Sequence, residues 1–159
     1  MASDRTTALA DDFSNANAEA MDFVRRCTAA EWTLTVPGEE WPVGVVLHHV
    51  AVGHGHGVRW LHEMASGEGV TDTAEGIDGE NAAHALRMTA VGQDETLALL
   101  EQNGTRLEAA LRALSDEELV RTAPFGPAGG RAMPIEALAA VGARHTREHL
   151  AHARGAISS

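Results

Sequence analysis

The sequence Arg144-His145-Thr146-Arg147-Glu148-His149 lies near the C-terminus, in a segment whose apolar residues recur at helical spacing. His145 and His149 are four residues apart, so both imidazoles project from the same face of a helix. Two imidazoles on one face can chelate a divalent ion, and a third ligand then has to come from elsewhere in the chain. This stretch therefore predicts a helix with a metal-binding face.

The predicted helix extends in both directions from this stretch, over residues 134–157. Pro134 suits its first turn, where the missing N–H costs nothing. Leu138 and Val141 share a face with the two histidines, which indicates that the imidazoles point towards the protein interior. Buried polar groups need partners, so two inward-facing imidazoles call for a metal, a carboxylate or a water cluster.

Three further helices are predicted from apolar spacing, over residues 3–27, 42–66 and 80–114. Residues 28–42, 67–79 and 122–133 are turn-rich and read as connectors, and Ser115 with Glu118 forms a capping box that predicts a short extra turn. Four long helices predict an all-α protein, a four-helix bundle, with residues 1–159 in one domain. The second connector is long enough to cross the bundle, so that the third helix runs parallel to the second.

Composition narrows the classes of partner and compartment. The net charge is −11 and the twelve basic residues are all Arg, so the surface repels phosphate groups and we expect neither nucleic-acid nor membrane binding. The chain has one cysteine, Cys27, so an intramolecular disulfide is excluded. With no signal-peptide pattern and no apolar run long enough to span a bilayer, we expect a cytoplasmic protein. Cys27 is interpreted as a packing residue near a helix end rather than a nucleophile.

The third metal ligand is expected from the second helix, which carries His48 and His49. Neighbouring residues on a helix point about 100° apart, so only one of these two can face the interior. Apolar periodicity favours His49 and puts His48 towards the edge, and His56, two turns further on, is the alternative. His49, Gly53 and Gly57 follow one another on a single face. The small residues there allow either close approach of another helix or a pocket.

The remaining histidines have less direct interpretations. His54 and His62 are predicted to lie on the surface. His84 lies off the apolar stripe of the third helix, so we expect it at the surface too unless that helix bends near Gly92. His152 follows His149 by three residues and reads as a fourth ligand, a partner of a ligand or a residue at the pocket rim.

Trp41, His49 eight residues later, the pair Val50-Ala51, and His145 with His149 together resemble the DinB/YfiT-like superfamily. The resemblance covers essentially the whole chain. It implies a four-helix bundle with a divalent metal, in most cases zinc or nickel, held by His49, His145 and His149.

The resemblance also implies an activity. Relatives include S-transferases that use mycothiol or bacillithiol, and a mycothiol-dependent isomerase. We therefore expect a metal-dependent transferase that joins a small-molecule thiol of the mycothiol type to a small electrophile. His152 and His84 are candidate catalytic residues, Glu80 is a further candidate base, and Asn81 is a candidate pocket residue. The alternatives are a metal-dependent hydrolase, a non-catalytic metal-binding bundle for stress response or interaction, and a plain bundle. Bundles of this kind often dimerise through a helix face, so a homodimer is a further expectation.

Overall fold

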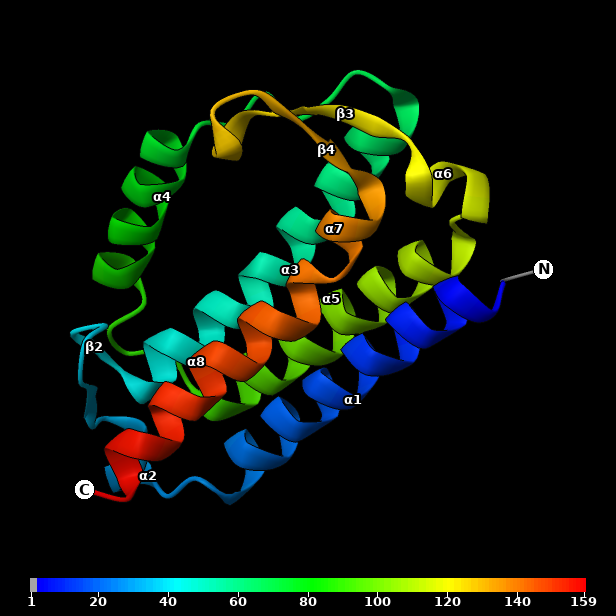
Figure 1. The fold of residues 1–159 in the computed structure, drawn as a ribbon. Helices are drawn as coiled ribbons and strands as arrows, with labels where there is room; N and C mark the ends of the chain where they lie inside the picture. The colour runs from blue at the N-terminus through cyan, green and yellow to red at the C-terminus, as the bar shows by residue number, and fades with distance from the viewer. Residues whose placement is uncertain (1–2) are drawn as a thin grey trace.

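A bundle of four long helices forms the body of the computed structural model, which describes residues 3–159. The four are α1 (Asp4–Arg26), α3 (Val43–Ser66), α5 (Gln93–Ala113) and α8 (Val141–Ile157). Helices α3 and α5 run in one direction, and α1 and α8 run in the opposite direction (Figure 1). Between α3 and α5 the chain passes through α4 (Ala74–Arg87), which lies to one side of the bundle (Figure 1).

Short elements close the two ends of the bundle. At one end are α2 (Ala29–Trp32) and the antiparallel strands β1 (Thr35–Val36) and β2 (Trp41–Pro42), in which Val36 pairs with Trp41. At the other end are α6 (Asp116–Val120), β3 (Thr122–Phe125), the 3₁₀ turn η1 (Gly126–Ala128), β4 (Arg131–Pro134) and α7 (Ile135–Ala139). Strands β3 and β4 are antiparallel, with Thr122 opposite Pro134.

The core follows the apolar stripes of the helices. In α1, side chains recurring at helical spacing from Ala10 and Phe13 to Val24 are fully buried. The buried residues form two clusters, one around Phe13 and Leu107 and one around Trp32 and Leu47. No helix among residues 3–159 is both long and apolar enough to cross a membrane.

The prediction of one helix over residues 80–114 is wrong, because the chain leaves the helical conformation between Met88 and Gly92. Val91 is buried there, and its carbonyl oxygen accepts a hydrogen bond of 2.8 Å from Trp32 Nε1. Gly92 then serves as the N-cap residue of α5. A contact with a residue 59 positions away thus outweighs local helical propensity.

Other boundaries also differ from the predictions. Helix α4 begins inside the predicted connector 67–79, because the Thr73 side chain accepts from the Gly76 N–H and caps it. The predicted loop 122–133 contains the β3–β4 hairpin, and the last helix is divided at Ala140. The predicted first and second helices are confirmed to within a residue at each end, and so is the capping box of Ser115 and Glu118.

One close contact between α1 and α5 can be tested directly. Asn17 is buried, and its Nδ2 donates to the Leu100 carbonyl oxygen at 3.2 Å. A Cβ on Gly104 would overlap Asn17 Nδ2. Gly104→Ala should therefore lower the free energy of unfolding by about 1–3 kcal/mol in urea denaturation, despite the better helix propensity of Ala. Gly155→Ala is the matched control, because a Cβ there meets open space, and it should stabilise by up to about 1 kcal/mol. Equal effects of the two substitutions would contradict this packing.

Candidate metal centre

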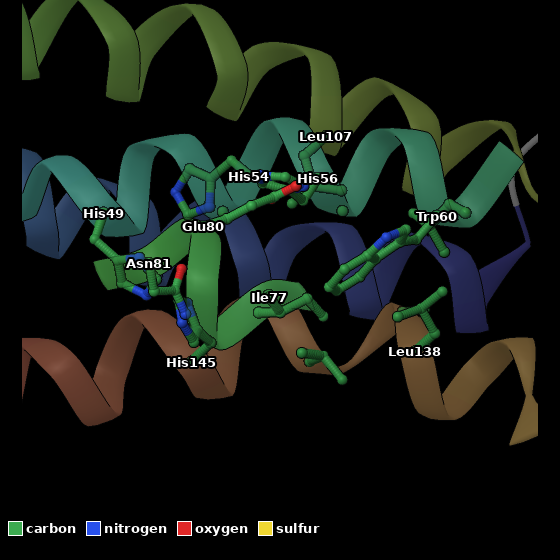
Figure 2. Close-up of a pocket in the computed structure, with 16 residues that line it drawn as sticks. His49, His54, His56, Trp60, Ile77, Glu80, Asn81, Leu107, Leu138 and His145 are labelled. Atoms are coloured by element: carbon green, nitrogen blue, oxygen red, sulfur yellow. The ribbon is translucent and has the colours of Figure 1, made fainter. Parts of the chain in front are cut away.

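Three imidazoles from two antiparallel helices converge at one end of the bundle. His49 comes from α3, and His145 and His149 come from successive turns of α8. One nitrogen of each ring lies within 4.8 Å of the others, and His145 Nε2 is 3.1 Å from His149 Nε2. In Figure 2, His49 and His145 lie together with Asn81 at one end of a cavity.

The turn between β1 and β2 supplies a carboxylate to this cluster. Glu39 Oε1 is 2.7 Å from Nδ1 of His149 and 2.7 Å from Nδ1 of His152. A carboxylate only accepts, so both Nδ1 atoms carry protons. His149 Nε2 is then a bare lone pair directed at His145, as required of a metal-ligating nitrogen. A carboxylate that fixes the tautomer of a ligating histidine is a recurring feature of metal sites.

Burial controls the charge of the cluster. Desolvation, with a smaller contribution from the neighbouring imidazoles, lowers the pKa of His49 and the pKa of His145 to about 3 each. Burial alone would raise the pKa of Glu39, but hydrogen bonds from His149 and His152 lower it below its ordinary value. His49 and His145 are therefore neutral at neutral pH, and the carboxylate of Glu39 is ionised.

This donor set fits a divalent ion. Zn–N bonds of about 2.0–2.1 Å place two nitrogens of a tetrahedral site roughly 3.3 Å apart, close to the 3.1 Å between His145 Nε2 and His149 Nε2. Neutral imidazole is a ligand that zinc and nickel both accept. Glu39, His149 and His152 form a second, overlapping group of possible ligands, but the hydrogen bonds already described occupy both Nδ1 atoms.

The prediction that His48 lies at the edge is wrong. His84 was expected at the surface unless the helix bent near Gly92; the helix breaks there, and His84 is buried. The two rings are buried and stacked, with His48 Nδ1 2.7 Å from His84 Nε2. The break after Met88 separates α4 from α5, so the apolar stripe of α5 does not determine which side of α4 is buried. Burial lowers the pKa of His84 to about 4 and also lowers that of His48.

The surface prediction for His54 is also wrong, since only 1% of this residue is exposed. His54 packs edge-on against Phe13, and its Nε2 is 3.0 Å from Asn17 Oδ1. His62 is exposed, as predicted, and His56 is half-buried near the site without joining the three imidazoles.

Glu39 is the functional candidate that sequence reasoning missed. The turn signal at Pro37-Gly38 was visible, and two glutamates follow it. Which of Glu39 and Glu40 faces the bundle depends on the left-handed backbone of Glu40, with φ of 59°. Helical periodicity carries no information about such a turn, so spacing rules could not select Glu39.

Two adjoining cavities open at the imidazoles. The apolar chamber, of about 230 Å³, has an apolar wall formed by Trp60, Leu61, Ile77, Leu107, Leu138 and Val141. The polar cleft, of about 440 Å³, is lined by His48, His84, Arg87 and Met88. His49, Gly53, His56, Glu80 and Asn81 border both cavities. Figure 2 shows Trp60 and Leu138 at the end of the chamber opposite His49 and His145.

Cys27 does not take part in this site. It is buried at the C-terminal end of α1, within the core cluster around Trp32 and Leu47. Burial, with a smaller contribution from the Glu31 carboxylate, raises the pKa of the Cys27 thiol to about 11. Cys27 is therefore a protonated packing residue at neutral pH, not an activated nucleophile.

Fold and site together define a helical bundle with a histidine cluster suited to a divalent metal. A family model of the DinB superfamily matches residues 12–153, and the chain belongs to that superfamily. None of the curated proteins matches the sequence significantly.

A solved structure with the same fold is that of YfiT from Bacillus subtilis, described as "a probable metal-dependent hydrolase with an unusual four-helix bundle topology". The TM-score is 0.78 at 20% sequence identity, and the match covers 98% of this chain and 87% of that one. At this identity the likeness establishes the fold. The DinB-like fold and the cluster of His and Glu side chains agree with a divalent-metal protein.

The role of Glu39 predicts the behaviour of a substitution. Glu39→Gln keeps an acceptor oxygen but removes the charge that holds the His149 tautomer and partly offsets the charge of an ion. Zinc affinity, measured by competition with a chelating dye, should fall about 10–100-fold. Glu40→Gln, at the exposed neighbouring position, should bind zinc like the parent. Equal affinity of the parent and both variants would remove Glu39 from the site.

The lowered histidine pKa values predict acid sensitivity of the metal-free protein. Folding lowers the pKa of His49 and His145 from 6.5 to about 3, and that of His54 from 6.5 to about 4. At a pH between the folded and the unfolded pKa values, the unfolded chain therefore binds more protons than the folded protein. The free energy of unfolding should therefore fall steadily as the pH drops from about 6.5 towards 3. Urea denaturation at a series of pH values measures this slope. A stability that stays constant between pH 6.5 and pH 4 would contradict burial of neutral imidazoles.

Proposed function

We propose that the protein is a divalent-metal-dependent S-transferase that joins a small thiol of the mycothiol type to a small electrophile. The observation that carries the proposal is the pair of unlike cavities that meet at His49. A transfer between two substrates needs two adjoining binding spaces, whereas hydrolysis needs space for one substrate and a water. The apolar chamber suits the electrophile and the polar cleft suits a hydrophilic thiol.

The metal centre would be held by His49, His145 and His149. When bound, a divalent ion there would stabilise the thiolate form of a thiol at neutral pH. In the neutral ring of His149, Glu39 holds the proton on Nδ1, so Nε2 is available as a ligand. His152 is 57% exposed and contacts Glu39 rather than the three imidazoles, which leaves the remaining coordination positions to substrate. This arrangement favours an enzyme over a closed, purely structural metal site.

The polar cleft offers two groups to the thiol substrate. Arg87 is exposed at its edge, and a guanidinium can bind a carboxylate or polar oxygens of a mycothiol-type molecule. Glu80 and Asn81 lie at the border of the two cavities, where the sulfur and the electrophilic carbon would meet. In the reaction a C–S bond forms, the carbon's bond to its halide or epoxide oxygen breaks, and the thiol proton passes to the leaving group or to solvent. Glu80 is the carboxylate residue among those that line the two cavities.

A metal-dependent hydrolase is the second candidate, and the description of YfiT favours it. The same three imidazoles would then serve to activate water. The two functions differ in whether a thiol is consumed.

The test is a thiol-by-electrophile screen with the zinc-loaded and the nickel-loaded protein. Mycothiol and bacillithiol are each combined with an epoxide, an alkyl halide and an activated alkene, and thioether products are measured by mass spectrometry. Thioether formation that is lost in His145→Ala supports the transferase. Hydrolysed electrophile in equal amounts with and without thiol supports the hydrolase. Metal-loaded protein with neither product contradicts both.

Arg87 gives a sharper prediction about the thiol site. Arg87→Ala should raise the KM for the thiol about fivefold or more and leave the KM for the electrophile unchanged, because only the polar cleft loses a charged contact. Arg131→Ala, an exposed position in the β3–β4 hairpin, is the control and should change neither constant. An equal rise in both constants for Arg87→Ala would show that the cleft does not hold the thiol.

A further inference from the structure

His54 is a buried polar side chain in the wall of the apolar chamber. Its residue is 1% exposed, while the other polar side chains of the chamber wall, such as His56 and Asn81, are half-buried or exposed. The edge of its ring packs on Phe13 with centroids 4.8 Å apart. It lies on α3 five residues beyond His49, so it is separate from the three imidazoles of the metal centre.

The hydrogen bonds around Asn17 determine which nitrogen of His54 carries the proton. Asn17 Nδ2 donates to the Leu100 carbonyl oxygen at 3.2 Å, which fixes the orientation of the amide. Asn17 Oδ1 therefore faces His54 Nε2, at 3.0 Å. An amide oxygen only accepts, so His54 Nε2 carries the proton and donates it. Burial lowers the pKa of His54 to about 4, so the ring is neutral at pH 7 and Nδ1 is a bare lone pair.

Among residues 3–159, the hydrogen bond of the His54 ring is made by Nε2, and Nδ1 makes none. His54 lines the apolar chamber, so an acceptor there that no protein group uses offers a place for a ligand donor. The chamber volume of about 230 Å³ exceeds the roughly 150 Å³ of an engineered apolar cavity that binds benzene. A molecule with a single ring therefore fits.

We propose that His54 Nδ1 is the hydrogen-bond acceptor for a small, mostly apolar ligand that carries one hydroxyl or N–H group and binds in the apolar chamber. The identification of this ligand as the electrophilic substrate rests on the proposed function. Binding itself does not, because the chamber and the acceptor are present whether the reaction is transfer or hydrolysis. His54 thus acts as a specificity-determining residue that favours ligands with a hydrogen-bond donor over purely apolar molecules.

The test compares benzyl alcohol with toluene, which differ by the one hydroxyl group. Dissociation constants are measured by NMR titration of the zinc-loaded full-length protein and again after removal of the metal. Burying a hydroxyl without a partner is costly, so an apolar cavity without an acceptor binds toluene much more tightly. We expect the parent to bind benzyl alcohol at least as tightly as toluene, with and without metal. Toluene binding more than about tenfold tighter in the parent would overturn the proposal.

Two variants separate His54 from other polar groups of the chamber. His54→Phe keeps a ring of similar size but removes the acceptor, and should lower the preference for benzyl alcohol over toluene by about fivefold or more. His62→Phe, at an exposed position of the same helix, should keep the parent's preference. An unchanged preference in His54→Phe would overturn the proposal.

A second measurement does not depend on the folding of either variant. Imidazole nitrogen NMR of the parent should show His54 as the neutral tautomer with the proton on Nε2. A proton on Nδ1 would overturn the proposal. Absence of thioether product in the screen, with the benzyl alcohol preference intact, would contradict the proposed function and leave this inference standing.

Discussion

Gly53 and Gly57 share a face of α3 and present no side chain there, and the positions of the neighbouring helices and of the cavity depend on this. A Cβ on Gly53 would lie 3.3 Å from His145 Cε1, and one on Gly57 would lie 3.4 Å from the Leu107 methyl groups. The glycines therefore let α8 bring His145 against α3, beside His49. Gly53 and Gly57 also border the apolar chamber. The small residues on this face therefore allow both the close approach of another helix and a pocket. The helix-propensity cost of about 1 kcal/mol for each glycine is offset by this packing.

Desolvation is what gives the cluster its chemical character. In water an imidazole would be partly protonated near neutral pH, and cations do not ligate metals. Burial between α3 and α8 keeps His49 and His145 neutral without a charged partner. Of the three clustered imidazoles, the Glu39 carboxylate contacts His149, at the outer nitrogen Nδ1, so the negative charge lies behind that ring and away from the nitrogens that face one another. An ion bound there would keep most of its positive charge for the groups it coordinates.

The bundle and part of the site could be predicted from the sequence, and the reason is local periodicity. The four-residue spacing of His145 and His149 fixes a shared face once the segment is helical, and the apolar neighbours turn that face inward. His54 and His84 could not be predicted in this way. His54 is buried with its Nε2 paired to Asn17 on another helix. His84 is buried against His48 of α3, on a helix that ends before Met88. Burial of a polar group depends on a partner distant in sequence, and a hydrophobic pattern does not contain that partner.

Two histidines, His149 and His54, each have their tautomer selected by a hydrogen-bond acceptor, and the two acceptors differ in charge. A fixed acceptor holds the proton on one ring nitrogen and leaves the other nitrogen bare: Glu39 does this for His149, and Asn17 for His54. A carboxylate suits His149, because its negative charge increases the basicity of a nitrogen that faces a cation. The neutral amide suits His54, because an anion beside Phe13 would have no compensating charge in the apolar wall and would raise the pKa of the ring. With Asn17, His54 stays neutral and accepts a hydrogen bond without drawing a metal ion or a proton into the chamber. The charged acceptor, Glu39, thus lies beside the cluster of imidazoles, and the neutral acceptor, Asn17, lies behind the apolar wall.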